Sequence, residues 1–135
     1  MVKRLLVIDD AMIIREMIKD AAREDGWEIA GHAVNGQEGI EQYELLRPDA
    51  VTLDLVMPEF DGLHALRGIR SFDSKAQVLI VSALDQAEIL KEALRCGAAD
   101  FISKPFNKVR LLAALAKMAT RGDSSPRRHA ELQPA

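Results

Sequence analysis

Short apolar runs alternate with amphipathic segments along most of the 135-residue chain. The runs expected to form strands are Leu5–Ile8, Trp27–Val34, Ala50–Leu53, Val78–Val81 and the segment containing Phe101 and Ile102. The first run has no polar–apolar alternation, which is typical of a strand buried on both faces, whereas the second is more polar and is expected at an edge. This alternation predicts an α/β fold with a single doubly wound, five-stranded parallel sheet.

Five amphipathic helices are expected between and after these strands. Their predicted ranges are Met12–Glu24, residues 36–46, Leu63–Ser71, Gln86–Cys96 and Asn107–Ala119. Apolar residues recur in them at helical spacing, and glycine or proline follows several of the expected helix ends. We expect one domain at residues 1–121 and a disordered tail at 122–135, because the tail has few apolar residues and two prolines.

The composition argues against several classes of partner. A net charge of −3 gives no support to binding of nucleic acid or of an anionic membrane surface. The single cysteine, Cys96, cannot form an internal disulfide, which fits a reducing compartment. Because no apolar run approaches a membrane span and the N-terminus lacks a signal-peptide core, we expect a cytoplasmic protein without membrane insertion.

Polar side chains stand at the ends of four of the five predicted strands. Asp9 and Asp10 follow the first strand, Asp54 follows the third, Ser82 the fourth and Lys104 the fifth. The carboxyl ends of parallel strands meet at one edge of the sheet, where such folds place their sites. Three crowded carboxylates repel one another and invite a cation, and Mg²⁺ prefers oxygen ligands of this kind.

A lysine and a hydroxyl beside such an ion are the groups that phosphoryl transfer uses, and a carboxylate can serve as the nucleophile. Taken singly, each residue also has an ordinary structural explanation. Asp10 is a common helix cap, Ser82 is a residue that usually bonds backbone, and Lys104 is compatible with a surface position. We favour a functional site because these explanations are improbable jointly.

Five motifs fall in order at these strand ends. They are DD at 9–10, D at 54 with MP at 57–58 and DG at 61–62, SA at 82–83, and KPF at 104–106. Over roughly residues 3–120 the chain thereby resembles the receiver domain of two-component response regulators, most closely the stand-alone, CheY-like type. The resemblance implies the flavodoxin-like strand order 2-1-3-4-5 and no enzymatic activity beyond self-phosphorylation from small phosphodonors and slow self-dephosphorylation.

The resemblance also implies the role of each acid. Asp54 would accept a phosphoryl group from a histidine kinase or a phosphotransfer protein. Asp9, Asp10 and Asp54 would hold Mg²⁺ together with the main-chain carbonyl of Val56. No other cofactor is implied.

Three further residues would form the switch that the resemblance implies. Ser82 would hydrogen-bond the phosphoryl group and move towards it, Lys104 would pair with a phosphoryl oxygen, and Phe101 would turn inward. Many members have Thr where this chain has Ser82, so the coupling is expected to be looser. The bond between Lys104 and Pro105 is expected to be cis, as in the family.

Val56 and Leu84 occupy positions that flank the path of the hydrolytic water in the family. Because neither side chain can orient water, self-dephosphorylation is expected to be slower than in a member with Asn and Glu there.

The downstream protein target is expected on the face formed by the helix at 86–96, the strand at 101–102 and the helix at 107–119. Candidate contacts on this face are Lys91, Glu92, Arg95, Lys108 and Arg110. We expect a monomer or weak dimer and a role in chemotaxis, with a phosphorelay intermediate or a regulator of another signalling protein as alternatives.

Three other functions are less well supported. A Mg²⁺-dependent phosphohydrolase of the haloacid dehalogenase type needs an Asp where this chain has Val56. A flavin-binding electron carrier needs a phosphate loop after the first strand, where Asp9 and Asp10 repel anions. A degenerate receiver that acts only as a scaffold would not be expected to retain all five polar residues.

Overall fold

A computed structural model describes residues 2–59, 61–83 and 87–123 of the chain. Its five strands run parallel in one sheet with the order β2-β1-β3-β4-β5, which confirms the predicted topology. The strands are β1 Arg4–Ile8, β2 Glu28–Ala33, β3 Ala50–Leu53, β4 Val78–Ala83 and β5 Asp100–Lys104. The more polar β2 lies at one edge, as its composition indicated.

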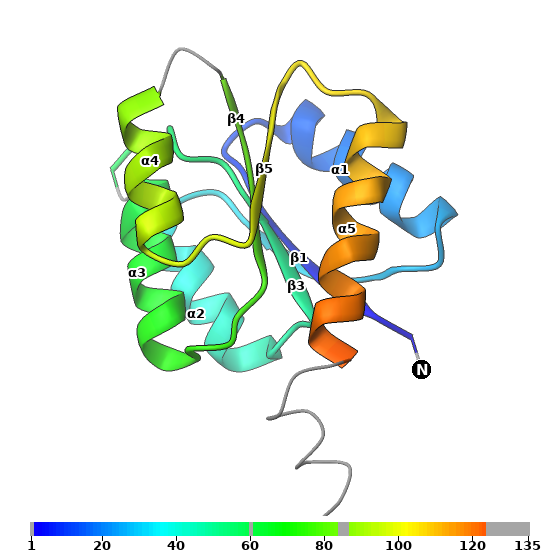
Figure 1. Cartoon of the computed structure of the whole chain (residues 1–135), viewed down its shortest axis with the longest axis horizontal. Coiled ribbons are helices and arrows are strands. Elements are labelled where there is room, and N and C mark those ends of the chain that lie inside the picture. Colours follow the sequence, from blue (N-terminus) through cyan, green and yellow to red (C-terminus); the bar gives the residue numbers. More distant parts are fainter. Residues whose placement is uncertain (1, 60, 84–86, 124–135) are drawn as a thin grey trace, which may run out of the picture.

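Helices cover both faces of the sheet in the described part of the chain (Figure 1). Their bounds are α1 Met12–Glu24, α2 Gly36–Leu46, α3 Gly62–Phe72, α4 Ala87–Arg95 and α5 Lys108–Asp123. The helices α1 and α5 pack on one face, and α2, α3 and α4 pack on the other (Figure 1). None of the helices among the described residues is both long and apolar enough to cross a membrane.

Helix α5 extends further than its sequence pattern indicated. It continues to Asp123 instead of ending at Ala119, so the first two residues of the predicted tail are helical. Residues 124–135 of that tail, and Gln86 at the predicted start of α4, lie outside the described residues. The boundary between domain and tail therefore stays a prediction.

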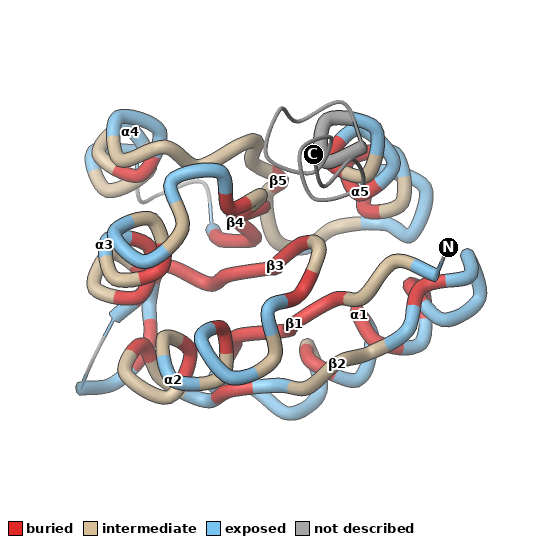
Figure 2. Tube along the Cα trace, turned by 90° about the horizontal axis from the view of Figure 1, so that it is seen from below, coloured by how far each residue is buried: buried red, intermediate tan, exposed pale blue. Residues whose placement is uncertain are grey.

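Alternate side chains of the central strands enter two separate cores. Leu6 and Ile8 of β1 pack under α2, α3 and α4, whereas Leu5 and Val7 pack under α1 and α5. All four are almost completely buried, and the central strands lie inside the molecule in Figure 2. A strand covered on both faces needs apolar residues at successive positions, which explains the uninterrupted LLVI run.

Candidate functional site

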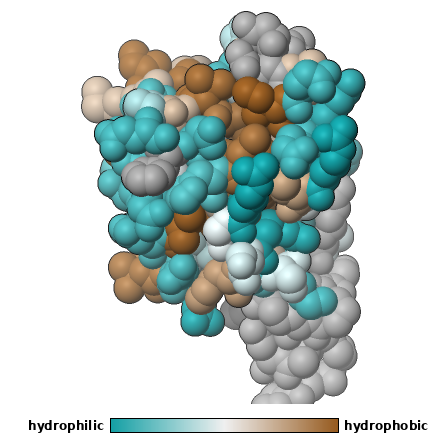
Figure 3. Space-filling model, turned by 90° about the vertical axis from the view of Figure 1, so that its left-hand side faces the viewer, coloured by the Kyte–Doolittle hydropathy of each residue, from teal (hydrophilic) through white to brown (hydrophobic). Residues whose placement is uncertain are grey.

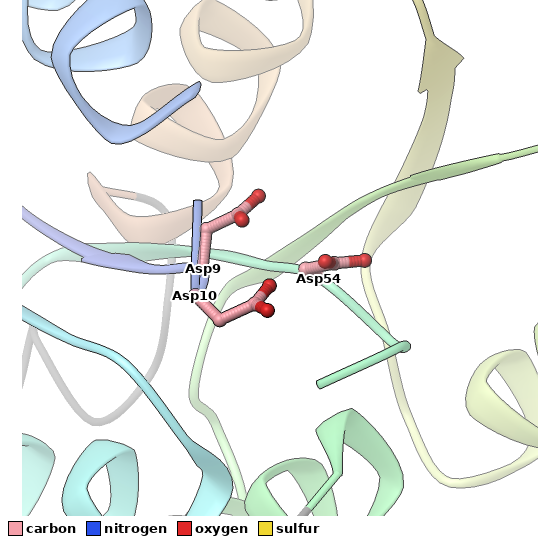
Figure 4. A group of neighbouring side chains, drawn as sticks. All are labelled: Asp9, Asp10 and Asp54. Atoms are coloured by element: carbon pink, nitrogen blue, oxygen red, sulfur yellow. The ribbon is translucent and has the colours of Figure 1, made fainter. Parts of the chain in front are cut away.

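Three carboxylates meet at the edge where β1 and β3 end (Figure 4). Asp9 and Asp10 follow β1 directly, and Asp54 follows β3. One carboxylate oxygen from each of the three residues lies within 4.8 Å of the others. Asp9 and Asp54 are buried, with 1% and 6% of their surface exposed, whereas Asp10 is exposed. The sequence-based expectation that these acids come together agrees with this geometry.

Asp9 is held in place through both its side chain and its backbone. Its Oδ1 accepts a hydrogen bond of 2.9 Å from the main-chain N–H of Ala11, and its Oδ2 accepts one of 2.9 Å from Nζ of Lys104. Its main-chain N–H donates to the carbonyl of Ala33 in the neighbouring strand at 3.1 Å. The N-cap residue of α1 is Ala11, so Asp10 does not act as the helix cap that its position also allowed.

Asp54 has donors on both of its carboxylate oxygens. Its Oδ1 accepts from the main-chain N–H of Val56 at 3.2 Å and from the hydroxyl of Ser82 at 3.4 Å. Its Oδ2 lies 3.2 Å from Nζ of Lys104. Burial raises the pKa of Asp54, and the charge of Asp9 adds to the rise, although Lys104 and the Val56 N–H oppose it. Asp54 is thus a carboxylate that folding holds in an unfavourable environment.

Lys104 bridges Asp9 and Asp54 with a single ammonium group. Its side chain is 22% exposed, and it approaches Asp9 and Asp54 from the end of β5. Burial favours the neutral amine, but the hydrogen bond to Asp9 and the charge of Asp54 outweigh it, so the pKa of Lys104 is raised. Lys104 therefore remains a cation and offsets part of the repulsion between the acids.

The donor set fits a hard divalent cation. All three groups are carboxylates, which suit Mg²⁺ better than softer metals. Within the described residues, the Asp10 carboxylate has no hydrogen-bond or ion-pair partner, so its oxygens are available as ligands. One ammonium beside three carboxylates leaves the cluster with an excess of negative charge.

The remaining predicted site residues lie on β4, on β5 and after β3. Ser82 lies within β4, one residue before its end, and is buried. Phe101 is half-buried and packs against the core under α4. The bond between Lys104 and Pro105 is cis, as expected. Leu84 lies outside the described residues, so its predicted role stays a prediction.

Gly62 is a residue of the site to which the sequence analysis assigned no role, although it belongs to the DG motif. It begins α3 directly after the N-cap Asp61, and its N–H donates to the carbonyl of Leu55 at 3.1 Å. A Cβ atom at this position would lie 2.3 Å from the main-chain oxygen of Asp54 and 2.5 Å from Cα of Leu55. The glycine of the DG motif could have indicated this contact, since a close approach of two backbone segments commonly requires glycine.

We expect Gly62→Ala to destabilise the protein by about 3 kcal/mol, because the clash involves backbone atoms that cannot rotate away. Chemical denaturation measures the change. The matched control is Gly39→Ala in α2, where the three atoms nearest to the new Cβ would all belong to the Ile8 side chain, the closest at 2.7 Å. The control should lose about 1 kcal/mol or less. Equal losses in the two variants would contradict the close approach at Gly62.

Residues 5–116 match the family model of the response regulator receiver domain. The chain belongs to this family, and its strand order and acid cluster agree with that membership. It is therefore the receiver of a two-component response regulator, and members of this class accept phosphoryl groups from histidine kinases or other phosphodonors and act on downstream targets.

Among characterised proteins, the chain is similar to the chemotaxis protein CheY of Thermotoga maritima, with 44% identity over 117 residues. It is 42% identical over 117 residues to the chemotaxis protein CheY of Bacillus subtilis. Both alignments cover 87% of this chain and 98% of the relative. The chain is thus CheY-like over nearly the whole length of these relatives, which disfavours the phosphohydrolase and flavin-carrier alternatives.

Two solved structures extend the similarity to the fold. The CheX–CheY–BeF₃–Mg²⁺ complex from Borrelia burgdorferi has a TM-score of 0.81 and 31% identity, covering 85% of this chain and 87% of that chain. The response regulator domain of Thermotoga maritima CheB has a TM-score of 0.80 and 33% identity, covering 93% of this chain and 100% of that chain.

Proposed function

We propose that Asp54 is the phosphoacceptor of this receiver and that its donor is a phosphohistidine on a kinase or phosphotransfer protein. The observation that carries the proposal is the contact set of Asp54. It is a buried carboxylate beside two further acids, with Ser82 and Lys104 within reach of its oxygens. Few structural roles require a buried acid beside two other acids. A carboxylate that acts as the nucleophile in phosphoryl transfer does need such surroundings.

The reaction follows from these groups. A carboxylate oxygen of Asp54 attacks the phosphorus atom, and the P–N bond of the phosphohistidine breaks. The electron pair of that bond stays on the histidine nitrogen, and the acyl phosphate forms on Asp54. Lys104 moves from its carboxylate partners to a phosphoryl oxygen, and the Ser82 hydroxyl donates to another. We assign the subsequent inward turn to Phe101.

Asp9, Asp10, Asp54 and the main-chain carbonyl of Val56 would hold Mg²⁺. Bound there, the ion supplies positive charge that offsets the repulsion between the Asp54 carboxylate and the incoming phosphoryl oxygens. The Borrelia CheY neighbour was solved as a complex that contains both BeF₃ and Mg²⁺, which supports this part of the proposal.

Exposed apolar side chains around the acid cluster support a protein as the phosphodonor. Met12 and Ile13 at the start of α1 are 65% and 70% exposed, and Val56 after β3 is 52% exposed. Figure 3 shows hydrophobic side chains along the upper edge of the face that α3 and α4 cover, which is the edge where the strands end. A kinase or phosphotransfer domain would cover such side chains when its histidine reaches Asp54.

A direct test incubates the protein with Mg²⁺ and a small phosphodonor such as acetyl phosphate. Peptide mass spectrometry should locate the phosphoryl group on the peptide that contains Asp54, and hydroxylamine should remove it, as expected for an acyl phosphate. A chelator should prevent labelling. Stable phosphate on a serine or histidine would overturn the proposal.

We also propose that the acyl phosphate is lost slowly. Val56 presents an exposed apolar side chain beside Asp54 and cannot orient an attacking water. Val56→Asn should therefore release phosphate severalfold faster, measured after removal of the phosphodonor. Val34→Asn is the matched control, because Val34 is a half-exposed valine at the same edge, after β2, and its variant should retain the original rate. Rapid release from the unmodified protein would contradict this proposal.

The output surface that we propose is the α4–β5–α5 face. Lys91 and Arg95 on α4 and Arg110 on α5 are exposed and remain candidate contacts. Glu92 pairs with Arg95 at 3.0 Å and with Arg67 of α3 at 3.5 Å, and Lys108 pairs with Glu24 of α1. These two residues therefore lie at the margins of the face. A chemotaxis target, a cytoplasmic location and a monomer or weak dimer stay predictions.

A further inference from the structure

Arg15 reaches the acid cluster from the buried side of α1. Only 9% of this residue is exposed. Its guanidinium Nη1 donates a hydrogen bond of 2.8 Å to the main-chain carbonyl of Asp9, and both groups are buried. Its Nε has no hydrogen-bond partner within the described residues. Arg15 is thus a buried cation whose hydrogen bond to the protein ends on the backbone of a proposed metal ligand.

Packing does not explain an arginine at this position. The same face of α1 buries Ile18, Ala21 and Ala22, and an apolar residue of similar volume would fill the space without a desolvation cost. The buried Nε without a partner adds to that cost. What arginine supplies, and an apolar side chain lacks, is the hydrogen bond to the Asp9 carbonyl.

That carbonyl belongs to the peptide group that joins Asp9 to Asp10. The Asp9 side chain is already held by Ala11 and Lys104, whereas the Asp10 side chain has no partner within the described residues. The direction of the Asp10 carboxylate therefore depends on its backbone. A hydrogen bond that fixes the preceding peptide plane limits the positions from which Asp10 can face the other two acids.

We propose that Arg15 is a positioning residue for the Mg²⁺ site, acting through the peptide group between Asp9 and Asp10. This inference rests on the proposed Mg²⁺ site. Outer-shell partners commonly have this role, because they orient ligands that would otherwise be mobile. The positive charge of Arg15 by itself repels a cation, so its removal would strengthen Mg²⁺ binding if charge were its only contribution. Positioning predicts the opposite sign.

Isothermal titration of the unphosphorylated protein with Mg²⁺ distinguishes these possibilities. Arg15→Met should raise the Kd for Mg²⁺ roughly tenfold, as is usual when an outer-shell partner is lost. Arg15→Gln, which is too short to reach the carbonyl, should behave similarly and serves if the first variant does not fold. Lys19→Met is the matched control, since Lys19 is a buried cation one turn later that contacts Glu16 and His32 instead. It should retain the original Kd.

Thermal unfolding without Mg²⁺ separates positioning from a general effect on the fold. The melting temperature of Arg15→Met should stay near that of the unmodified protein, because an apolar side chain replaces a costly buried cation. An unchanged or lower Kd in both Arg15 variants would overturn the inference, as would equal weakening in Lys19→Met. Failure of the unmodified protein to bind Mg²⁺ would instead refute the proposed metal site itself.

Discussion

Asp54→Asn is expected to abolish phosphorylation by a small phosphodonor in the presence of Mg²⁺, with a loss of more than about a thousandfold in rate. An amide oxygen is a far weaker nucleophile than a carboxylate. The two other acids of the cluster are not expected to replace Asp54 as the nucleophile. Asp9 is bound to Ala11 and Lys104, and Asp10 is exposed at the rim of the cluster. The measurement is the rate of phosphate incorporation, followed by mass spectrometry of the intact protein.

The matched control for this variant is Asp61→Asn. Asp61 lies in the same loop and caps α3 by accepting a hydrogen bond from the main-chain N–H of His64 at 3.0 Å. Asn caps helices about as well as Asp, so this variant should be phosphorylated like the unmodified protein. Equal labelling of Asp54→Asn and the unmodified protein would show that another residue accepts the phosphoryl group.

Asp54→Asn should also stabilise the fold, so a loss of phosphorylation in this variant cannot be attributed to unfolding. The pKa of Asp54 is raised in the folded state by burial, so the folded protein binds more protons at this residue than the unfolded chain. The free energy of unfolding therefore falls as the pH rises from the ordinary carboxyl range through the raised pKa. Asp54→Asn removes this loss and should be more stable at neutral pH without Mg²⁺.

Stability measured across pH checks that argument. The advantage of Asp54→Asn should shrink as the pH falls and Asp54 becomes protonated in the unmodified protein. An Asp54→Asn variant that is clearly less stable at neutral pH would mean that the contact with Lys104 outweighs the cost of burying the carboxylate.

Lys104→Met is expected to slow phosphorylation by roughly a hundredfold to a thousandfold, the usual loss when one donor to a developing anion is removed. The ammonium lies 2.9 Å from Asp9 and 3.2 Å from Asp54 before the reaction, so it needs to move little to reach a phosphoryl oxygen. Binding of Mg²⁺ should persist, because the three carboxylates remain and a competing cation is gone. Phosphorylation kinetics and Mg²⁺ titration measure the two effects separately.

Without Mg²⁺, Lys104→Met should also lower the free energy of unfolding at neutral pH by about 1–2 kcal/mol, since a partly buried ion pair is broken. The pKa of Lys104 is raised above its ordinary value, so its stabilising contribution is complete below that value and is lost only as the pH rises through the raised pKa. In the variant, the pKa of Asp54 should rise further because its attraction to Lys104 is absent. The deficit should therefore shrink at acidic pH.

Lys108→Met provides the control for removing a lysine. Lys108 forms an ion pair with Glu24, but both side chains are more than half exposed. Such surface pairs contribute at most about 1 kcal/mol, and Lys108 does not contact the acid cluster. A phosphorylation rate in Lys104→Met equal to that of the control would exclude Lys104 from the reaction.

Where the sequence pattern was periodic, element bounds could be predicted closely. The bounds of α1 and β3 agree with the prediction, because apolar periodicity and flanking breakers are local signals. The end of β4 was placed too early, at Val81 instead of Ala83. Ser82 pairs with Ser103, and Ala83 pairs with Lys104, so pairing with β5 extends β4 by two residues. That pairing joins segments distant in the sequence, so no local sequence pattern predicts it.

The sequence was sufficient for the fold class, the strand order through its resemblance, and the types of residue at the strand ends. The three-dimensional arrangement was needed to show which atoms meet. Lys104 contacts Asp9 although the two are 95 residues apart in the sequence, and Arg15 donates a hydrogen bond to the Asp9 carbonyl. At Gly62, the absence of a Cβ atom allows the backbone of Asp54 to lie close by. Burial patterns are local and repeat along the chain. A hydrogen bond between remote residues instead requires that folding set the donor–acceptor distance to within a few tenths of an ångström.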